Sequence, residues 1–212
     1  MNAPDSFPQL LCMRHGAVTE AVRGRLYGRL DVPLSEAGRE QIRRAAQALR
    51  RDLAADGSLP PLRLISSPLS RCRESAALVR EALRGADGSL PPLLVDDDLA
   101  EIALGQWEGL PKAEIRRRFP AQWAARGTDM AHAAPPGGES FAGAQQRALA
   151  AVRRLAAGYP DESLLLLSHA GLIRCLMAHV LALPLQEVLR LPLPFAAVVR
   201  LDREGIGPVG KG

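Results

Sequence analysis

Short apolar runs alternate along the chain with longer segments in which apolar residues recur every three or four positions. Runs of five or so apolar residues bounded by polar ones are typical of strands buried on both faces, and the longer pattern is typical of amphipathic helices. The alternation predicts a three-layer α/β/α sandwich with a mostly parallel central sheet. The expected strands are residues 9–13, 62–66, 93–96, 164–168 and 197–202.

Capping residues place the starts of the expected helices. Ser35 precedes one apolar stripe as a candidate N-cap. Ser67 and Pro68 have the order expected for an N-cap followed by the first helical residue. A third helix is expected after Gly138, and a fourth from Gly171.

The chain has 212 residues, of which 47% are hydrophobic, enough for one substantial core. We therefore expect residues 1–212 to form a single domain. Residues 102–139 are less regular and contain both tryptophans, so we expect them to cap a site. Residues 203–212 include four glycines and are expected to be a flexible tail.

Charge and composition argue against several classes of partner. The net charge is +4, but the basic residues are scattered and aromatic residues make up only 4%, so we expect no nucleic-acid partner. No apolar run approaches 20 residues, and the first residues lack a secretory pattern, so we expect no membrane partner and a cytoplasmic location. The cysteines, Cys12, Cys72 and Cys175, are odd in number and widely spaced, which favours free buried thiols over disulfides.

Two histidines stand where an expected strand meets its following loop. Arg14-His15-Gly16 ends the first run, and Ser168-His169-Ala170-Gly171 ends the fourth. The carboxyl ends of parallel strands meet at one edge of the sheet, where loops and helix N-termini converge on ligands. The pair of motifs therefore predicts a site at this edge.

A series of motifs continues in order over nearly the whole chain. They are Arg14-His15-Gly16; Gly28, Asp31, Leu34, Ser35 and Gly38; residues 66–72; residues 99–101 with 105–109; residues 137–140; and residues 168–171. Together they resemble the histidine phosphatase (phosphoglycerate mutase-like) superfamily. They are most similar to the branch of α-ribazole phosphatases and broad phosphomonoesterases.

The resemblance implies that His15 is the nucleophile and forms a phosphohistidine, with its other ring nitrogen held by a backbone carbonyl. Arg14 and Arg71 offer fork-shaped donors for the two negative charges of a phosphomonoester. The same cations discourage protonation of His15, which needs a free lone pair. His169 is expected to donate to the phosphoryl oxygens.

The resemblance also implies that Glu101 is the acid that protonates the leaving oxygen, in competition with Asp96, Asp97, Asp98 and Glu108. Gly16 and Ala170 are expected beside the substrate. Glu139 fits a helix cap as well as a substrate contact. The remaining histidines, His132 and His179, make no metal-ligand spacing with a neighbour, so we expect no metal and no cofactor.

One position departs from the family pattern. Ala21 stands where the family has an asparagine that helps to bind the phosphoryl group. Thr19, Arg23 and Arg25 are the candidates to supply the missing donor.

The sequence is thus read as a metal-independent phosphomonoesterase for a small phosphorylated metabolite. One alternative is a mutase of the phosphoglycerate type, although the segment between Glu101 and Glu139 is short for one. Another is a non-catalytic phosphate-binding module, which the missing asparagine favours. The substrate is left open, and so is a homodimer, a common state for such folds.

Overall fold

The computed structural model describes residues 10–56, 61–202 and 205–207. Within them, six strands form one sheet in the order β3-β2-β4-β1-β5-β6. Strands β3, β2, β4 and β1 run parallel to one another, whereas β5 pairs antiparallel with β1 and with β6, so the expected mostly parallel sheet is confirmed. The strands are β1 (Leu10–Arg14), β2 (Leu62–Ser66), β3 (Leu93–Val95), β4 (Ser163–Ser168), β5 (Val198–Asp202) and β6 (Gly205–Gly207).

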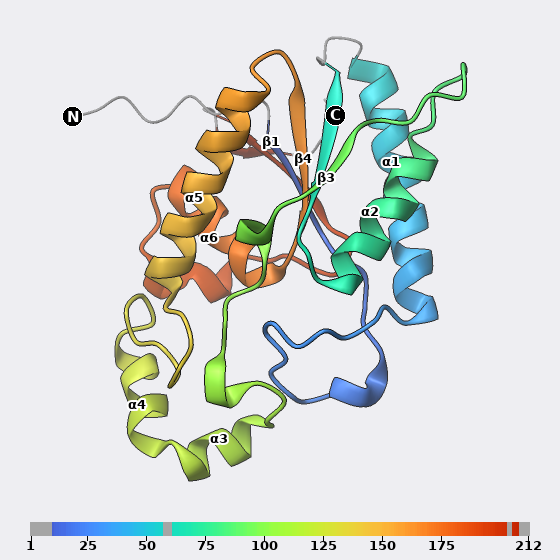
Figure 1. Ribbon diagram of the computed structural model, residues 1–212. Helices are drawn as coiled ribbons and strands as arrows, with labels where there is room; N and C mark the ends of the chain where they lie inside the picture. The colour runs from blue at the N-terminus through green and yellow to red at the C-terminus, as the bar shows by residue number, and fades with distance from the viewer. Residues whose placement is uncertain (1–9, 57–60, 203–204, 208–212) are drawn as a thin grey trace, which may run out of the picture.

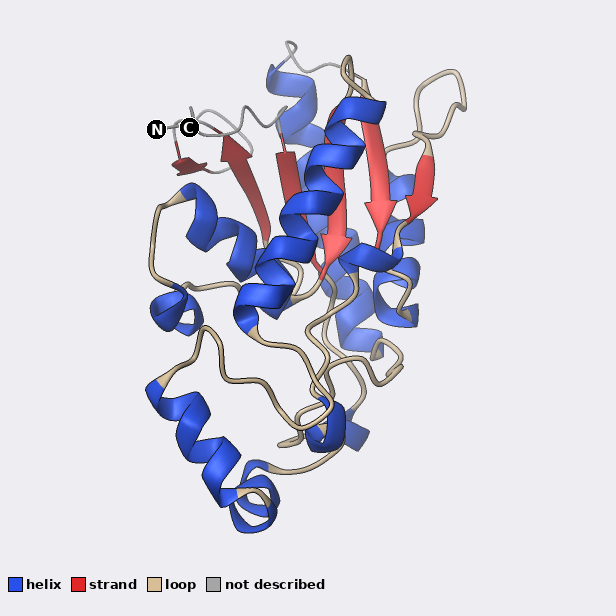
Figure 2. Cartoon of the chain, turned by 60° about the vertical axis from the view of Figure 1, so that its left-hand side comes forward, coloured by secondary structure: helices blue, strands red, loops and turns tan. Residues whose placement is uncertain are grey.

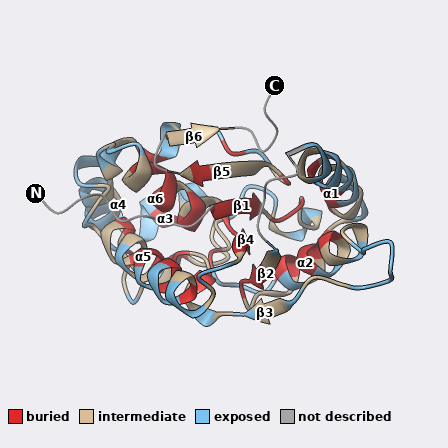
Figure 3. Cartoon of the chain, turned by 90° about the horizontal axis from the view of Figure 1, so that it is seen from above, coloured by how far each residue is buried: buried red, intermediate tan, exposed pale blue. Residues whose placement is uncertain are grey.

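Helices cover both faces of the sheet, as Figures 1 and 3 show. Helices α1 (Glu36–Asp56) and α2 (Ser70–Ala82) lie on one face. Helices α5 (Phe141–Gly158) and α6 (Ala170–Val180) lie on the other. The expected three layers are confirmed.

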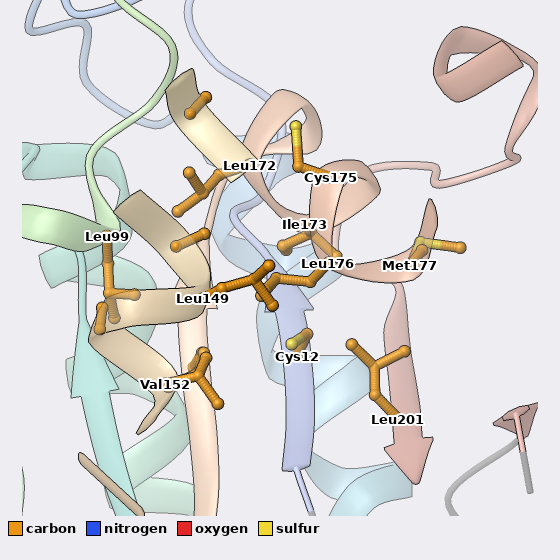
Figure 4. Packing of buried hydrophobic residues seen from close by; sticks show 14 of the residues in the cluster. Cys12, Leu99, Leu149, Val152, Leu172, Ile173, Cys175, Leu176, Met177 and Leu201 are labelled. Carbon is orange, nitrogen blue, oxygen red and sulfur yellow. The ribbon is translucent and has the colours of Figure 1, made fainter. Parts of the chain in front are cut away.

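The central strands are mostly apolar because they divide their side chains between two cores. Successive side chains of a strand point to opposite faces of the sheet. Leu10 and Cys12 of β1 join the core under α5 and α6, part of which Figure 4 shows, whereas Leu11 and Met13 join the core under α1 and α2. Burying one such leucine contributes about 1.5–3 kcal/mol, so β1 is strongly held between the layers.

Short helices and loops lie beyond the carboxyl ends of the parallel strands, at the bottom of Figure 2. We call residues 102–139 the cap. It contains η3 (Gly105–Trp107), α3 (Lys112–Arg118) and α4 (Pro120–Thr128). The other 3₁₀ helices among the described residues are η1 (Glu20–Val22), η2 (Asp97–Leu99) and η4 (Leu185–Arg190).

The helix starts test the capping predictions. The Ser35 hydroxyl accepts the N–H of Gly38 at 3.0 Å, which confirms Ser35 as the cap of α1. The prediction for α2 was wrong by two residues, since the helix begins at Ser70 rather than Pro68. The Ser67 hydroxyl lies 2.7 Å from His169 Nε2 and makes only a long contact, 3.4 Å, with the N–H of Leu69. Asp31 instead accepts the N–H of Ser70 at 2.8 Å.

The other helix and strand starts need smaller corrections. Helix α6 begins at Ala170, one residue before the expected Gly171. The first strand is described from Leu10, and Gln9 lies outside the described residues.

The C-terminal segment is more regular than its glycines suggest. Gly205–Gly207 forms the edge strand β6, with Ile206 opposite Leu201 of β5. This part of the expected flexible tail is therefore ordered by backbone pairing, which needs no side chains. Residues 203–204 and 208–212 lie outside the described residues.

The expectations about the cysteines and about membrane-spanning helices also concern the fold. Cys12, Cys72 and Cys175 are free and buried, as predicted. Within the described ranges, no helix is both long and apolar enough to cross a membrane.

Candidate active site

A cavity of about 200 Å³ opens beside the ends of β1 and β4, between the sheet and the cap. Of the predicted site residues, Arg14, His15, Glu101 and Ala170 line it. Arg71 and His169 are fully buried next to His15, and Gly16 also lies outside the lining. The other lining residues are Arg25, Leu26, Tyr27, Gly28, Ile102, Leu104, Arg126, Phe141 and Gly171.

The imidazole of His15 is held by its own loop. Its Nδ1 lies 2.7 Å from the carbonyl oxygen of Gly16. A carbonyl only accepts, so Nδ1 carries the proton and Nε2 keeps its lone pair. The expected backbone carbonyl is confirmed. Burial, reinforced by the charges of Arg71 and Arg14, lowers the pKa of His15 to about 3.

The backbone around His15 is fixed from several sides. Its N–H donates to the Ser168 carbonyl at 3.1 Å, and its carbonyl accepts the N–H of Ala196 at 3.2 Å. A Cβ atom at Gly16 would collide with the carbonyl of Gly38 at the start of α1. Glycine at position 16 therefore lets the loop that carries His15 lie directly on the helix backbone.

His169 and Arg71 form a buried pair behind His15. The Arg71 Nε–H donates to His169 Nδ1 at 3.3 Å, so the other nitrogen, Nε2, carries the proton and donates to Ser67 Oγ at 2.7 Å. Arg71 also donates to the carbonyls of Gly28 and Leu30, at 2.6 and 2.8 Å. Burial, and then the charges of the site, lower the pKa of His169 well below its usual value.

Arg14 lines the cavity, and part of its guanidinium is not engaged in hydrogen bonds. Its Nη1 donates to the carbonyl of Leu193 at 2.7 Å, and its guanidinium lies 3.8 Å from the centre of the Phe195 ring. Its Nε is buried and makes no hydrogen bond to the described residues. A half-buried cation with an unused N–H group is suited to an anionic ligand.

Glu101 is the one carboxylate among the described residues that line the cavity. One oxygen accepts the N–H groups of Ile102, at 2.9 Å, and Leu172, at 3.1 Å. The other accepts the N–H of Gly171 at 3.1 Å. Glu101 thus lies at the N-terminus of α6, where a negative charge is favoured by the helix dipole.

Three of the four competing carboxylates have structural partners elsewhere. Asp96 and Asp98 pair with Arg154, at 2.6 and 2.8 Å. Glu108 accepts backbone N–H groups of Arg29 and Leu104, at 2.9 and 3.1 Å.

Of the two interpretations of Glu139, the structure contradicts the helix cap, because Ser140 takes that place. Glu139 pairs with Arg147 at 2.7 Å. The neighbouring Ser140 caps α5 by accepting the N–H of Gly143 at 3.1 Å.

The segment with the missing asparagine brings a different residue to the cavity. Ala21 is exposed, and neither Thr19 nor Arg23 lines the cavity, whereas Arg25 and Tyr27 do. Burial raises the pKa of the Tyr27 hydroxyl, against the opposing charges of Arg14 and Arg71, so it stays a hydrogen-bond donor at neutral pH. The sequence reasoning missed Tyr27, although its place just before the motif residue Gly28 was a usable signal.

Across residues 10–56, 61–202 and 205–207, no three or more histidine, cysteine or acidic side chains are grouped so that they could share a metal ion.

Comparison with known proteins identifies the relatives of this chain. A family model described as the histidine phosphatase superfamily (branch 1) matches residues 10–211. The glucosyl-3-phosphoglycerate phosphatase of Mycolicibacterium vanbaalenii is 35% identical over 188 residues, which cover 84% of this chain and 76% of that protein. The adenosylcobalamin/alpha-ribazole phosphatase of Salmonella typhimurium is 30% identical over 176 residues, covering 83% of this chain and 81% of the relative.

Solved structures agree with the sequence relatives. The mycobacterial glucosyl-3-phosphoglycerate phosphatase in complex with VO3 aligns with a TM-score of 0.74 at 32% identity, covering 91% of this chain and 90% of that one. A putative alpha-ribazole-5'-P phosphatase from Escherichia coli also gives a TM-score of 0.74, covering 98% of this chain and 99% of that one. Its sequence identity is 22%, so this similarity supports the fold alone.

Proposed function

This chain belongs to the histidine phosphatase superfamily, and on that premise we propose that it hydrolyses phosphomonoesters of small metabolites through a phosphohistidine on His15. The observation that carries the proposal is the state of His15. Its Nδ1–H is bound to the Gly16 carbonyl, which leaves Nε2 nucleophilic beside two arginines and above the cavity that Glu101 lines.

In the first step, Nε2 of His15 attacks phosphorus and the bond from phosphorus to the leaving oxygen breaks. Arg14 binds the nonbridging oxygens, the charge of buried Arg71 behind His15 adds to the attraction, and Glu101 gives its proton to the departing alkoxide. His169 Nδ1 accepts an N–H of Arg71 in this structure, so it must take up a proton before it can donate to the phosphoryl group. The two negative charges of the substrate favour that charged form.

In the second step, water attacks the phosphohistidine. Glu101, now ionised, takes a proton from the water as the bond between nitrogen and phosphorus breaks. Phosphate leaves, His15 is neutral again, and Glu101 is protonated for the next cycle. No step needs a metal ion, because the arginines supply the positive charge that Mg²⁺ supplies in many phosphoryl transferases.

We further propose that residues 1–212 are one domain that acts in the cytoplasm on a small molecule rather than on nucleic acid. Both hydrophobic cores pack on the same sheet, which supports one domain. Free cysteines are typical of a reducing compartment. Because of the named relatives, glucosyl-3-phosphoglycerate and α-ribazole phosphate are the first substrates to test.

A quenched reaction with phosphoryl-labelled substrate tests this function. The wild type should release labelled inorganic phosphate and yield an acid-labile, base-stable phosphoenzyme, while His15→Ala should lose several orders of magnitude in turnover. His132→Ala, a substitution at an exposed histidine, is the matched control and should keep full activity. Residual activity of His15→Ala within about tenfold of the wild type, or label on serine or cysteine, would contradict the proposal. Label recovered on a second substrate molecule would indicate a mutase.

A further inference from the structure

Arg126 brings a positive charge to the cavity that no acidic residue offsets. It lies near the end of α4 in the cap and lines the same cavity as His15. Its Nη1 is buried without a hydrogen-bond partner, and no acidic side chain of the described residues forms an ion pair with its guanidinium. An arginine keeps its charge even when buried, so this charge lacks a counter-charge.

The ring contacts of Arg126 do not supply that counter-charge. Its guanidinium carbon is 5.0 Å from the centre of the Phe141 ring and 5.7 Å from that of Trp107. Such contacts orient a cation through the partial charges of the ring face, but they leave its full charge in place. Burial lowers the pKa of Arg126, and no neighbouring carboxylate opposes this.

The cavity as a whole is more positive than a phosphoryl group requires. Three arginines, Arg14, Arg25 and Arg126, line it against the single carboxylate of Glu101, and Arg71 lies behind His15. Arg14 and Arg71 are sufficient for the two charges of a phosphomonoester. Arg126 and Arg25, which line the same cavity, are therefore available to bind negative charge elsewhere on the ligand.

From the unpaired guanidinium of Arg126 in the cap, we propose that this enzyme selects phosphomonoesters whose alcohol portion carries a carboxylate. The inference rests on the proposed phosphatase activity and adds the chemical class of its substrate. A guanidinium presents two parallel N–H groups that match the two oxygens of a carboxylate, which makes this group the natural partner.

The position of Arg126 leaves room for alcohols of different length. Beyond it lies a second cavity, of about 450 Å³. Arg126, Leu26 and Leu104 line both cavities, so Arg126 stands where they meet. The second cavity is mostly apolar, with Trp107, Trp123 and Met130 in its wall, and accommodates the uncharged remainder of a longer alcohol.

The test compares phosphorylated hydroxy acids with two, three and four carbons, each against its own primary amide. Acid and amide have nearly the same shape and differ in charge, so the ratio of their kcat/KM values isolates the contribution of the carboxylate. We expect the wild type to prefer the acid by about tenfold or more at one length at least, and Arg126→Met to reduce that ratio to about twofold or less. Arg126→Lys should retain part of the preference.

Arg116→Met is the matched control. Arg116 lies on the same cap and its guanidinium is 5.1 Å from the Trp123 ring, but it lines neither cavity. The same substitution there should leave both the ratio and the activity unchanged. If Arg126→Met does not fold, inhibition of the wild type tests the carboxylate preference instead. The free hydroxy acid should inhibit hydrolysis of p-nitrophenyl phosphate at a concentration about tenfold lower than its amide does.

The outcomes separate this inference from the function on which it rests. Equal turnover of acid and amide at every length by the wild type would overturn the inference, and so would an acid preference that survives Arg126→Met. If the wild type hydrolyses no phosphomonoester, p-nitrophenyl phosphate included, the proposed function itself fails.

Discussion

The imidazole rings of His15 and His169 lie edge to face, with their centres 5.2 Å apart and their planes at 61°. Both rings are buried, and Arg71 lies close enough to disfavour a positive charge on either. The two histidines are therefore neutral together in this structure, and an anionic ligand is what would allow one of them to become charged.

The pH behaviour of His15 is the first prediction. Its pKa is lowered to about 3, so its ring signals in an NMR titration should stay at the neutral position from pH 8 down to about pH 4.5. Comparison with the spectrum of His15→Ala identifies the signals. A midpoint near the ordinary histidine value of about 6.5 would contradict the prediction.

The same shift predicts how stability changes with pH. An unfolded histidine gains a proton below about pH 6.5, whereas folded His15 does so only near pH 3. The contribution of His15 to the free energy of unfolding is therefore fully present above about pH 6.5 and is lost as the pH falls from there toward 3. When the pH is lowered from 7 to 5, the free energy of unfolding should fall by up to about 2 kcal/mol less in His15→Gln than in the wild type. Denaturant unfolding at the two pH values measures this difference.

The second prediction concerns Ser67, whose hydroxyl holds His169. Ser67→Ala should lower kcat by about tenfold and change KM less. Without the hydroxyl, the imidazole of His169 is misplaced while phosphorus is attacked, which slows the chemical step. Ser67→Thr, which keeps the hydroxyl, should recover much of the loss.

Ser163→Ala is the control for Ser67. Ser163 is also a buried serine, but it lies at the opposite end of β4 and its hydroxyl has no hydrogen-bond partner among the described residues. Its substitution should leave kcat unchanged. An equal fall in both variants would mean that Ser67 acts through general stability.

The third prediction separates chemistry from structure at Glu101. Glu101→Gln should lower turnover of an alkyl phosphate by about 100-fold or more, but that of p-nitrophenyl phosphate far less, since nitrophenolate leaves without a proton. Equal losses on both substrates would assign Glu101 a structural role. Thermal unfolding provides the control, because the glutamine amide would face the N–H of Gly171 or Leu172 and cost about 1–3 kcal/mol of stability.

The fourth prediction is that activity survives prolonged treatment with a strong chelator. The reason is that the proposed mechanism assigns to Arg14 and Arg71 the positive charge that a metal would otherwise supply. Phosphatase activity measured before and after EDTA, and again after adding back divalent ions, checks this. Loss with EDTA and recovery with one ion would show that a metal takes part.

The strands could be predicted well because their apolar runs have one simple cause. Every residue of β4 is buried, since Leu164 and Leu166 face one core and Leu165 and Leu167 the other. The start of α2 could not be predicted this way. The Ser67 hydroxyl could bind either the N–H groups at the start of the helix or a side chain from elsewhere in the fold. It binds His169, which lies 102 residues away in the sequence. Local capping patterns carry no information about such a partner.

The site was predictable where motif residues follow strands and not where the cap supplies them. Arg14, His15 and Glu101 were all expected, and all three line the cavity. Arg126 went unnoticed because α4 has no buried residues and its sequence resembles an ordinary exposed helix. Its role depends on how the cap folds over the sheet, which is a tertiary contact.

The carboxylate of Glu101 also serves as the N-terminal cap of helix α6, through the N–H groups of Gly171 and Leu172. An acid that gives up and regains a proton would strengthen and weaken these two hydrogen bonds in turn. Amide exchange at Gly171 and Leu172 would then follow the protonation of Glu101, slowing while the carboxylate is charged. Hydrogen exchange at these two amides would therefore report the protonation state of Glu101 without a chromogenic substrate.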